Sequence, residues 1–209
     1  LCLCNYSLKV MIEDSYLYKD ILALDSIGKL EKLVKLLQAL ALQIGSQVSY
    51  NEIGQLVGLD TKTVDRYIDV LEKNYVIFRL GSFARNLRNE LKASRKIYFY
   101  DNGIRNAVIQ NFAPLSLRQD TGALWENFFI SERIKANHYN GNYAKSFFWR
   151  TTQQQEIDYI EEADGNFTAF EMKWNPNKRP ITFPSPFLNN YPVKETVVIT
   201  PENYLEWVM

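Results

Sequence analysis

The stretch EIDYIEEADGNFTAFEMKW, residues 156 to 174, holds Asp158, Glu171 and Lys173 in a segment that otherwise alternates apolar and polar residues like a half-buried β-hairpin. Two carboxylates and an ammonium in this pattern can hold a divalent cation, because Mg²⁺ takes one or two carboxylates together with waters and phosphate oxygens. The same residues can also form a local ion pair on a solvated polar face. The pattern D-x(n)-E-x-K is common, so spacing alone leaves both interpretations open.

The dipeptide Asp164-Gly165 predicts the turn that brings these residues together, because a two-residue type I′ turn needs positive φ at both central positions. The resulting register places Asp158 opposite Glu171, and Lys173 opposite Glu156, on one face. The other face is predicted to be a core face and carries Ile157, Tyr159, Phe170, Met172 and Trp174. Opposed acids on neighbouring strands repel each other, so we expect either Lys173 or a metal ion beside them.

A helix is expected over TGALWENFFISERIKANHY, residues 121 to 139, with Asp120 or Thr121 as its cap. Apolar residues occur nearly all around it, which indicates burial on more than one side. Glu126 lies in its middle, and a buried carboxylate requires a partner. Arg133, two turns along, and the hairpin cluster are the two candidates. Strands are expected at 144 to 150 and 195 to 201, with a proline-rich connection at 176 to 192 between the hairpin and the last strand.

The first half of the chain predicts a winged helix-turn-helix. Leucines at three- and four-residue spacing favour a helix within residues 27 to 45. Residues 47 to 80 then predict two helices separated by a turn at Gly58, with Ser49 capping the first, followed by the strand-like VIFRL and a later KIYFY. We expect an irregular N-terminus over 1 to 15, a helical winged helix-turn-helix domain over 16 to 113, and a second domain over 119 to 209.

Basic residues concentrate between Lys62 and Lys96, where nine of them face four acids, although the whole chain balances 24 Lys and Arg against 24 Asp and Glu. The predicted nucleic-acid contacts, on the second helix and the wing, are Lys62, Arg66, Lys73, Arg85, Arg88, Lys92 and Arg95. Asp65 and Asp69 argue against base reading, because phosphates flank the groove that the helix would enter. The alternative is a helix-turn-helix used for protein contact or as a rigid spacer.

Composition narrows the class of protein. A chain of 209 residues with 46% apolar content can bury a core in one or two domains. Cys2 and Cys4 are too close to form a disulfide framework, which favours a reducing, cytoplasmic location. The sequence lacks an 18-residue apolar run, so neither a membrane span nor a membrane partner is expected. With the single histidine His138, histidine-rich metal sites are excluded.

Glu126 on a helix, then Asp158 and Glu171-Met172-Lys173 on successive strands, resemble the PD-(D/E)XK nuclease-like superfamily, whose restriction-endonuclease-like core is α-β-β-β-α-β. The wider set of motifs is similar to the region that follows the ATPase module in a large family of bacterial and archaeal AAA-type P-loop ATPases, where a winged helix precedes a nuclease-like domain. The motifs are YLYKDI (16–21), the helix-turn-helix, KIYFYDNGIRNA (96–107), GALWENFFISE (122–132), FFWRTTQQQEIDYI (147–160) and FEMKW (170–174). Prolines over 176 to 192 leave room for only a short helix before the last strand.

The resemblance implies roles for individual residues. Asp158 and Glu171 would hold Mg²⁺ or Mn²⁺, with Glu126 binding that ion through water or holding a second one. Lys173 would orient the attacking water or stabilise charge on the phosphate. Arg150 and Gln155 are secondary candidates for phosphate contact.

The chain lacks the phosphate-binding loop G-x-x-x-x-G-K-[ST], because its only Gly-Lys pair, Gly28-Lys29, is followed by Leu30. Neither ATP binding nor ATP hydrolysis is therefore expected, and the sequence reads as the C-terminal fragment of an ATPase whose missing module is a partner. Three hypotheses stay open: a metal-dependent nuclease delivered to DNA by the winged helix, a DNA-binding or partner-recognition module without cleavage, and a structural or regulatory part of the ATPase ring.

Overall fold

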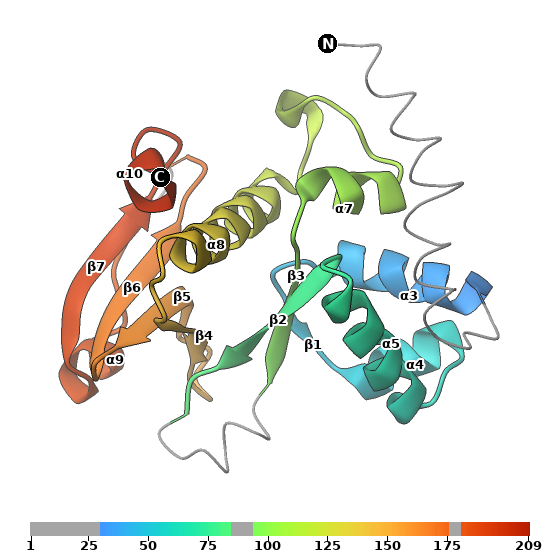
Figure 1. The fold of residues 1–209 in the computed structure, drawn as a ribbon, viewed down its shortest axis with the longest axis horizontal. Coiled ribbons are helices and arrows are strands. Elements are labelled where there is room, and N and C mark those ends of the chain that lie inside the picture. Colours follow the sequence, from blue (N-terminus) through green and yellow to red (C-terminus); the bar gives the residue numbers. More distant parts are fainter. Residues whose placement is uncertain (1–29, 85–93, 176–180) are drawn as a thin grey trace. The chain divides into compact units, whose positions relative to one another are not determined.

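The computed structural model describes residues 30–84, 94–175 and 181–209, which form two compact units (Figure 1). Unit 1 comprises Leu1–Arg79 and Ile97–Arg118, and unit 2 comprises Leu80–Lys96 and Gln119–Met209. The segment Leu80–Lys96, which the sequence analysis places in the first domain, therefore belongs with the second unit. The expected irregular N-terminus, the YLYKDI motif and the wing residues Arg85, Arg88 and Lys92 lie outside the described residues.

Unit 1 contains the three helices and two strands expected from the sequence, in the expected order. Helix α3 (Leu30–Leu42) is followed by β1 (Gln47–Val48), α4 (Tyr50–Val57), α5 (Thr61–Lys73), β2 (Ile77–Ser82), β3 (Arg95–Phe99), α7 (Asn102–Val108) and the short η1 (Leu115–Leu117). Of these elements, β1, α7 and η1 were not expected. The predicted leucine stripe is buried, with Leu33, Leu37 and Leu40 fully inaccessible. Strands β2 and β3 continue from this unit into unit 2, because the boundary falls inside both of them.

Local capping explains the two helices of the predicted helix-turn-helix. The Ser49 hydroxyl accepts a hydrogen bond from the Glu52 N–H at 3.3 Å, and the Asp60 carboxylate accepts one from the Thr63 N–H at 3.0 Å. Gly58 ends α4 in the left-handed conformation, with φ 67°. The predicted cap at Ser49 and the turn at Gly58 are confirmed.

Unit 2 is built on a mixed sheet in which the end of β2 is followed by β4, β5, β6 and β7. Its further strands are β4 (Lys145–Arg150), β5 (Glu156–Ala163), β6 (Asn166–Met172) and β7 (Val193–Ile199), and its helices are α8 (Thr121–Tyr139), α9 (Ser185–Asn190) and α10 (Leu205–Val208). The pairs β4–β5 and β5–β6 are antiparallel, whereas β2–β4 and β6–β7 are parallel. The helix before the last strand is short, six residues, as the prolines predict. In the described residues, we find no helix that is both long and apolar enough to cross a membrane.

The hairpin of β5 and β6 has the predicted register. Asp164 and Gly165 both have positive φ, 52° and 77°, and the ladder runs from Ala163 opposite Asn166 to Tyr159 opposite Phe170. A bulge not expected from the sequence lies on the other side of β5. Pairing advances by two residues on β4, from Phe147 to Trp149, but by three on β5, from Ile160 to Ile157. Such an irregularity re-aims the side chains within it, and Asp158 is one of them.

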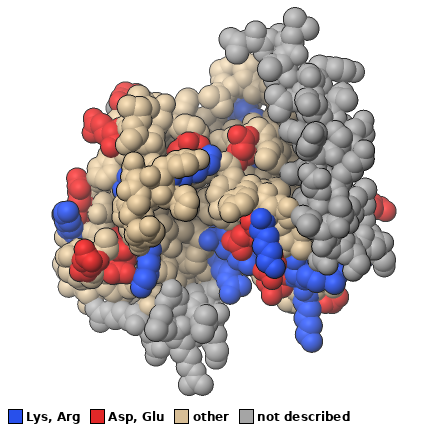
Figure 2. Space-filling model, in the orientation of Figure 1, with Lys and Arg blue, Asp and Glu red and all other residues tan. Residues whose placement is uncertain are grey.

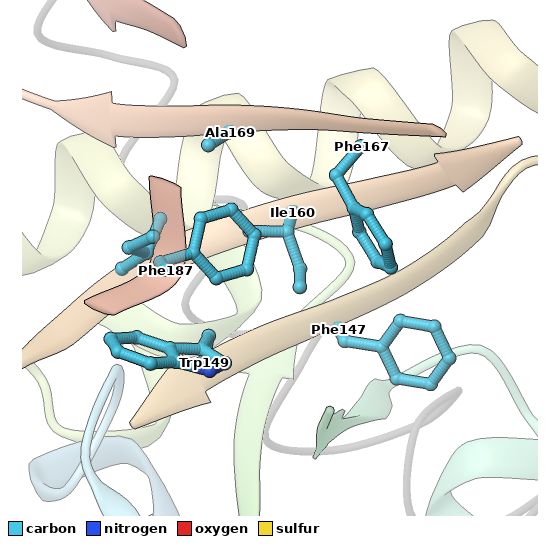
Figure 3. Packing of buried hydrophobic residues seen from close by; sticks show 7 residues of the cluster. Phe147, Trp149, Ile160, Phe167, Ala169 and Phe187 are labelled. Atoms are coloured by element: carbon cyan, nitrogen blue, oxygen red, sulfur yellow. The ribbon is translucent and has the colours of Figure 1, made fainter. Parts of the chain in front are cut away.

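Helices cover both faces of this sheet. On one face, Phe170 packs against Phe129 of α8 and Trp207 of α10, with ring centroids 5.8 and 5.1 Å apart. On the other, Phe187 of α9 packs against Trp149 and Phe167 in a buried apolar cluster (Figure 3). Tyr159, Phe170 and Met172 of the predicted core face are buried, but the prediction is wrong at two positions. The bulge turns Ile157 into the cluster with Trp149 and Phe187 on the opposite face, and Trp174 is 42% exposed because it follows the end of β6.

A buried ion pair joins three elements of unit 2. The Arg133 guanidinium on α8 donates to both carboxylate oxygens of Glu161 on β5, at 2.9 and 2.8 Å, and to the Trp207 carbonyl at 2.6 Å. Asn137 and the Tyr159 hydroxyl donate to the same Glu161 carboxylate. Arg133 therefore serves this buried acid, and Glu126 is left with other partners.

The α9 cluster yields a test of the fold. We expect Phe187→Ala to lower the free energy of unfolding by about 3–5 kcal/mol, since it removes a fully buried ring from between Trp149 and Phe167. The matched control is Leu188→Ala on the same helix, where the side chain is 40% exposed and the expected cost is below about 1 kcal/mol. Urea denaturation measures both, and equal costs would contradict the packing of α9 on the sheet.

Candidate functional site

Asp158 and Glu171 come together at the open end of the β5–β6 hairpin. The Met172 N–H donates to Oδ2 of Asp158 at 3.4 Å, which places this carboxylate next to the backbone that carries Glu171. The Lys173 ammonium donates to Oε2 of Glu171 at 2.9 Å. Sequence reasoning therefore correctly grouped Asp158, Glu171 and Lys173.

The ionisation of Glu171 is strongly perturbed. Burial and the nearby Asp158 charge together raise the pKa of this carboxyl from its usual 4.5 to about 7, although Lys173 partly opposes the shift. A carboxyl group whose pKa lies near neutral pH, next to a second carboxylate, favours the binding of an additional positive charge. The two acids can thus accept a cation in addition to Lys173.

Lys96 is a member of the site that the sequence analysis missed. Its side chain is 2% exposed, and its ammonium lies 3.4 Å from Oε1 of Glu126 and 2.5 Å from Oε1 of Glu156. Glu156, predicted opposite Lys173, is instead held by Lys96 and Arg150. The signal was present in KIYFYDNGIRNA, where Lys96 directly precedes the apolar Ile97, Tyr98 and Phe99 of β3.

Arg150 and Gln155 are neighbours of Glu156, Arg150 through an ion pair and Gln155 along the chain. The Arg150 guanidinium is 3.3 Å from Oε2 of Glu156 and also donates to the Gln154 side chain. Among the described residues, Oε1 of Gln155 is a buried side-chain oxygen for which the structure shows no hydrogen-bond partner. An unsatisfied buried acceptor is costly, so this amide is a natural point for contact with a donor from outside the chain.

The fit of a metal ion rests on two carboxylates. In the ranges that the structure describes, no three His, Cys, Asp or Glu side chains are grouped so as to hold a metal ion. The predicted third ligand, Glu126, lies beside Lys96. The pair Asp158 and Glu171 still suits Mg²⁺ or Mn²⁺, because one or two carboxylates with water and phosphate oxygens complete such a shell.

The basic surface predicted on the second helix and the wing is only partly described by the structure. Lys62, Arg66 and Lys73 are exposed on α5 and, at spacings of four and seven residues, lie on one helical face. Arg95 is half-buried at the start of β3, and the other predicted wing residues are not described. On the coloured part of the surface in Figure 2, basic and acidic side chains are intermixed.

The acids of α5 have an internal partner. Asp65, Asp69 and Glu72 lie 3.2, 2.5 and 2.8 Å from the Arg79 guanidinium, which also donates to the Tyr50 hydroxyl. Arg79 comes from β2, directly after α5. Arg79 offsets one of these three negative charges, so Asp65 and Asp69, whose side chains are 52% and 47% exposed, still argue against base reading by α5.

Comparison with known proteins adds two family matches. The family described as "Domain of unknown function (DUF8612)" matches residues 11–115, and "Domain of unknown function (DUF4143)" matches residues 121–207. DUF4143 is a domain found in AAA-ATPase-associated proteins. Neither description names a fold, so the winged helix and the restriction-endonuclease-like fold stay predictions.

Two similar proteins are themselves uncharacterised, Mb2031c of Mycobacterium bovis and Rv2008c of Mycobacterium tuberculosis. Each is 28% identical over 131 residues, which cover 62% of this chain and 29% of the relative. The chain thus matches less than a third of their length. No solved structure matches it.

The Glu171 shift predicts a pH dependence of stability without metal. The folded chain keeps this proton up to about pH 7, whereas the unfolded chain releases it near its usual pKa of 4.5. Between these values the folded state binds more protons, so the free energy of unfolding falls as pH rises. Between pH 5 and 8 we expect the parent to lose on the order of 2–3 kcal/mol more than Glu171→Gln.

Denaturant titrations with a chelator present measure this difference. Glu162→Gln, on the neighbouring strand, removes a carboxylate outside the site and should keep the parent's pH profile. Identical profiles for the parent and Glu171→Gln would contradict the buried, acid-paired environment of Glu171.

Proposed function

Since the chain belongs to the family described as "Domain of unknown function (DUF8612)", we propose that it is the DNA-acting part of an AAA-ATPase-associated protein, with a metal-dependent phosphodiester-cleaving site in unit 2. One observation carries the proposal. Two carboxylates from paired strands, Asp158 and Glu171, meet beside an ammonium, Lys173, and the pKa of Glu171 is raised to about 7.

The order of elements in unit 2 supports the nuclease-like interpretation. Helix α8, strands β4, β5 and β6, the short α9 and strand β7 follow one another in the order α-β-β-β-(α)-β. Asp158 lies on the second of these strands, and Glu171 near the end of the third. The match of this region to DUF4143, a domain of AAA-ATPase-associated proteins, supports the link to an ATPase.

The residues of the site divide the chemical work. Asp158 and Glu171 would hold a Mg²⁺ or Mn²⁺ ion, which lowers the pKa of bound water and polarises the phosphate when present. The Lys173 ammonium donates to Glu171. If a cation also bound Glu171, the N–H groups of Lys173 could instead donate to a phosphate oxygen that gains negative charge during the reaction. Arg150 and the Gln155 amide lie next to Glu156, where they can position a substrate.

Helix α5 is the proposed DNA contact of unit 1. Its exposed basic face carries Lys62, Arg66 and Lys73, while Arg79 pairs with the three acids on the adjoining face and offsets one of their charges. Contacts from such a face to phosphates position a protein on DNA without reading sequence. This surface would serve equally a recognition module that binds DNA without cleavage, which is the second candidate function.

Calorimetric titration of Mn²⁺ tests the metal site. We expect the parent to bind with a dissociation constant on the order of 0.1–1 mM, and Asp158→Asn or Glu171→Gln to weaken binding at least about tenfold, since each removes one of two carboxylate ligands. Glu162→Gln should bind like the parent. If folded parent takes up no Mn²⁺ at millimolar concentration, with and without DNA, the nuclease proposal is wrong and the recognition module remains.

DNA binding tests the α5 surface separately. In fluorescence anisotropy with duplex DNA, we expect Lys62→Ala combined with Arg66→Ala to weaken binding about tenfold and to reduce the salt slope by about two, because two phosphate contacts are lost. Lys135→Ala combined with Lys145→Ala removes the same charge from unit 2 and serves as the control. Equal losses in both double variants would show non-specific attraction and contradict a contact through α5.

A further inference from the structure

Lys96 is the buried charge of the candidate site to which the proposed reaction gives no role. It lies on β3 inside the KIYFYDNGIRNA motif, and its side chain is 2% exposed. Its ammonium is 2.5 Å from Oε1 of Glu156, 3.4 Å from Oε1 of Glu126 and 5.3 Å from the centre of the Phe148 ring. A lysine buried to this degree needs paired carboxylates, and here it has two.

The backbone around Lys96 fixes its position. The following residues Ile97, Tyr98 and Phe99 are fully buried, and the preceding Ser94 carbonyl accepts a hydrogen bond from the Ser82 N–H at 3.0 Å. The ammonium is therefore a fixed cation. Burial alone lowers the pKa of Lys96, but the charges of Glu126, Asp158 and Glu156 more than offset this and raise it, which keeps the side chain protonated.

The four acids at this end of the sheet thus have different cations available to them. Glu126 and Glu156 already contact Lys96, and Glu156 also contacts Arg150. Glu171 contacts Lys173, which is far more exposed, at 38% of its side chain, and Asp158 accepts from the Met172 N–H. A partly exposed lysine can move away from its carboxylate at much lower cost than a buried one.

We propose that Lys96 is a resident cation for Glu126 and Glu156, so that among these four acids a divalent ion is taken by Asp158 and Glu171 alone. The proposal rests on the metal site proposed above. It assigns Glu126 a positioning role, in which it holds the Lys96 ammonium in place, instead of the metal-binding role that the resemblance implies. Lys96 then offsets part of the negative charge of the site, so that two carboxylates remain to bind the divalent ion.

Calorimetry with Mn²⁺ separates the two roles of Glu126. In Glu126→Gln we expect the Mn²⁺ dissociation constant to stay within about twofold of the parent's, while Asp158→Asn weakens binding at least about tenfold. A loss in Glu126→Gln as large as that in Asp158→Asn would overturn the proposal, because Glu126 would then be a ligand.

A second variant tests Lys96 directly and does not depend on metal binding by the parent. Lys96→Met keeps an unbranched apolar chain but releases Glu126 and Glu156 from the ammonium. We expect it to bind Mn²⁺ at least about tenfold more tightly than the parent, because the site loses one buried positive charge that would repel the ion. The control, Lys135→Met, removes an ammonium that pairs with Glu132 elsewhere on α8 at 2.7 Å, and should bind like the parent.

Folding of Lys96→Met is followed by circular dichroism with and without Mn²⁺. A variant that unfolds without the ion and folds with it supports the proposal, because a ligand of the native state stabilises that state. A folded variant with no gain in affinity, or one that stays unfolded in 10 mM Mn²⁺, would overturn it. Failure of the parent to bind Mn²⁺ would remove the nuclease proposal and the assignment of the ion to Asp158 and Glu171, and Lys96→Met would then decide only whether Lys96 acts as the resident cation.

Discussion

Repulsion among partly buried carboxylates is the constraint on which the rest of unit 2 depends. Glu126, Glu156, Asp158 and Glu171 converge where β5 begins and β6 ends, and their charges cannot remain in a partly dry site without cations. The chain supplies two cations that differ in burial: Lys96 on β3 is buried, and Lys173 after β6 is partly exposed. This difference separates acids that stay paired from acids that can exchange their partner.

Unit 1 shows the same principle with a different result. Arg79 gathers the acids of α5 on one side, and the planar guanidinium can satisfy several carboxylates at once. The lysines and the arginine on the exposed side of the helix then face a negative field that Arg79 reduces by one of its three charges. Basic and acidic side chains thus lie on different sides of α5, a separation that the equal totals of 24 basic and 24 acidic residues do not reveal.

Local signals in the sequence were sufficient for much of the fold. The Asp164-Gly165 turn fixed the β5–β6 register, and Ser49 and Gly58 marked the ends of α4, because turn and cap chemistry involves only a few neighbouring residues. The part of the site that lies on this hairpin, Asp158, Glu171 and Lys173, could be predicted from that register. The contact of Lys96 with Glu126 joins residues 30 positions apart, which periodicity cannot predict. The bulge at Asp158 has no characteristic residue in the sequence, so it could not be predicted either. Trp174 was misplaced because alternation was continued past the end of the strand.

The division of the chain into units has a consequence for how such proteins can evolve. The segment Leu80–Lys96 precedes the DUF4143 match but belongs to unit 2, where Phe83 packs on Phe147 and Phe167, and Lys96 meets its two acids. A recombination event that transferred only residues 121–207 would carry the acids without Lys96 and would expose the ring contacts of Phe83. The boundary between the matched regions thus differs from the boundary between the units by the segment Leu80–Lys96, and a transfer that kept the site intact would carry that segment together with residues 121–207.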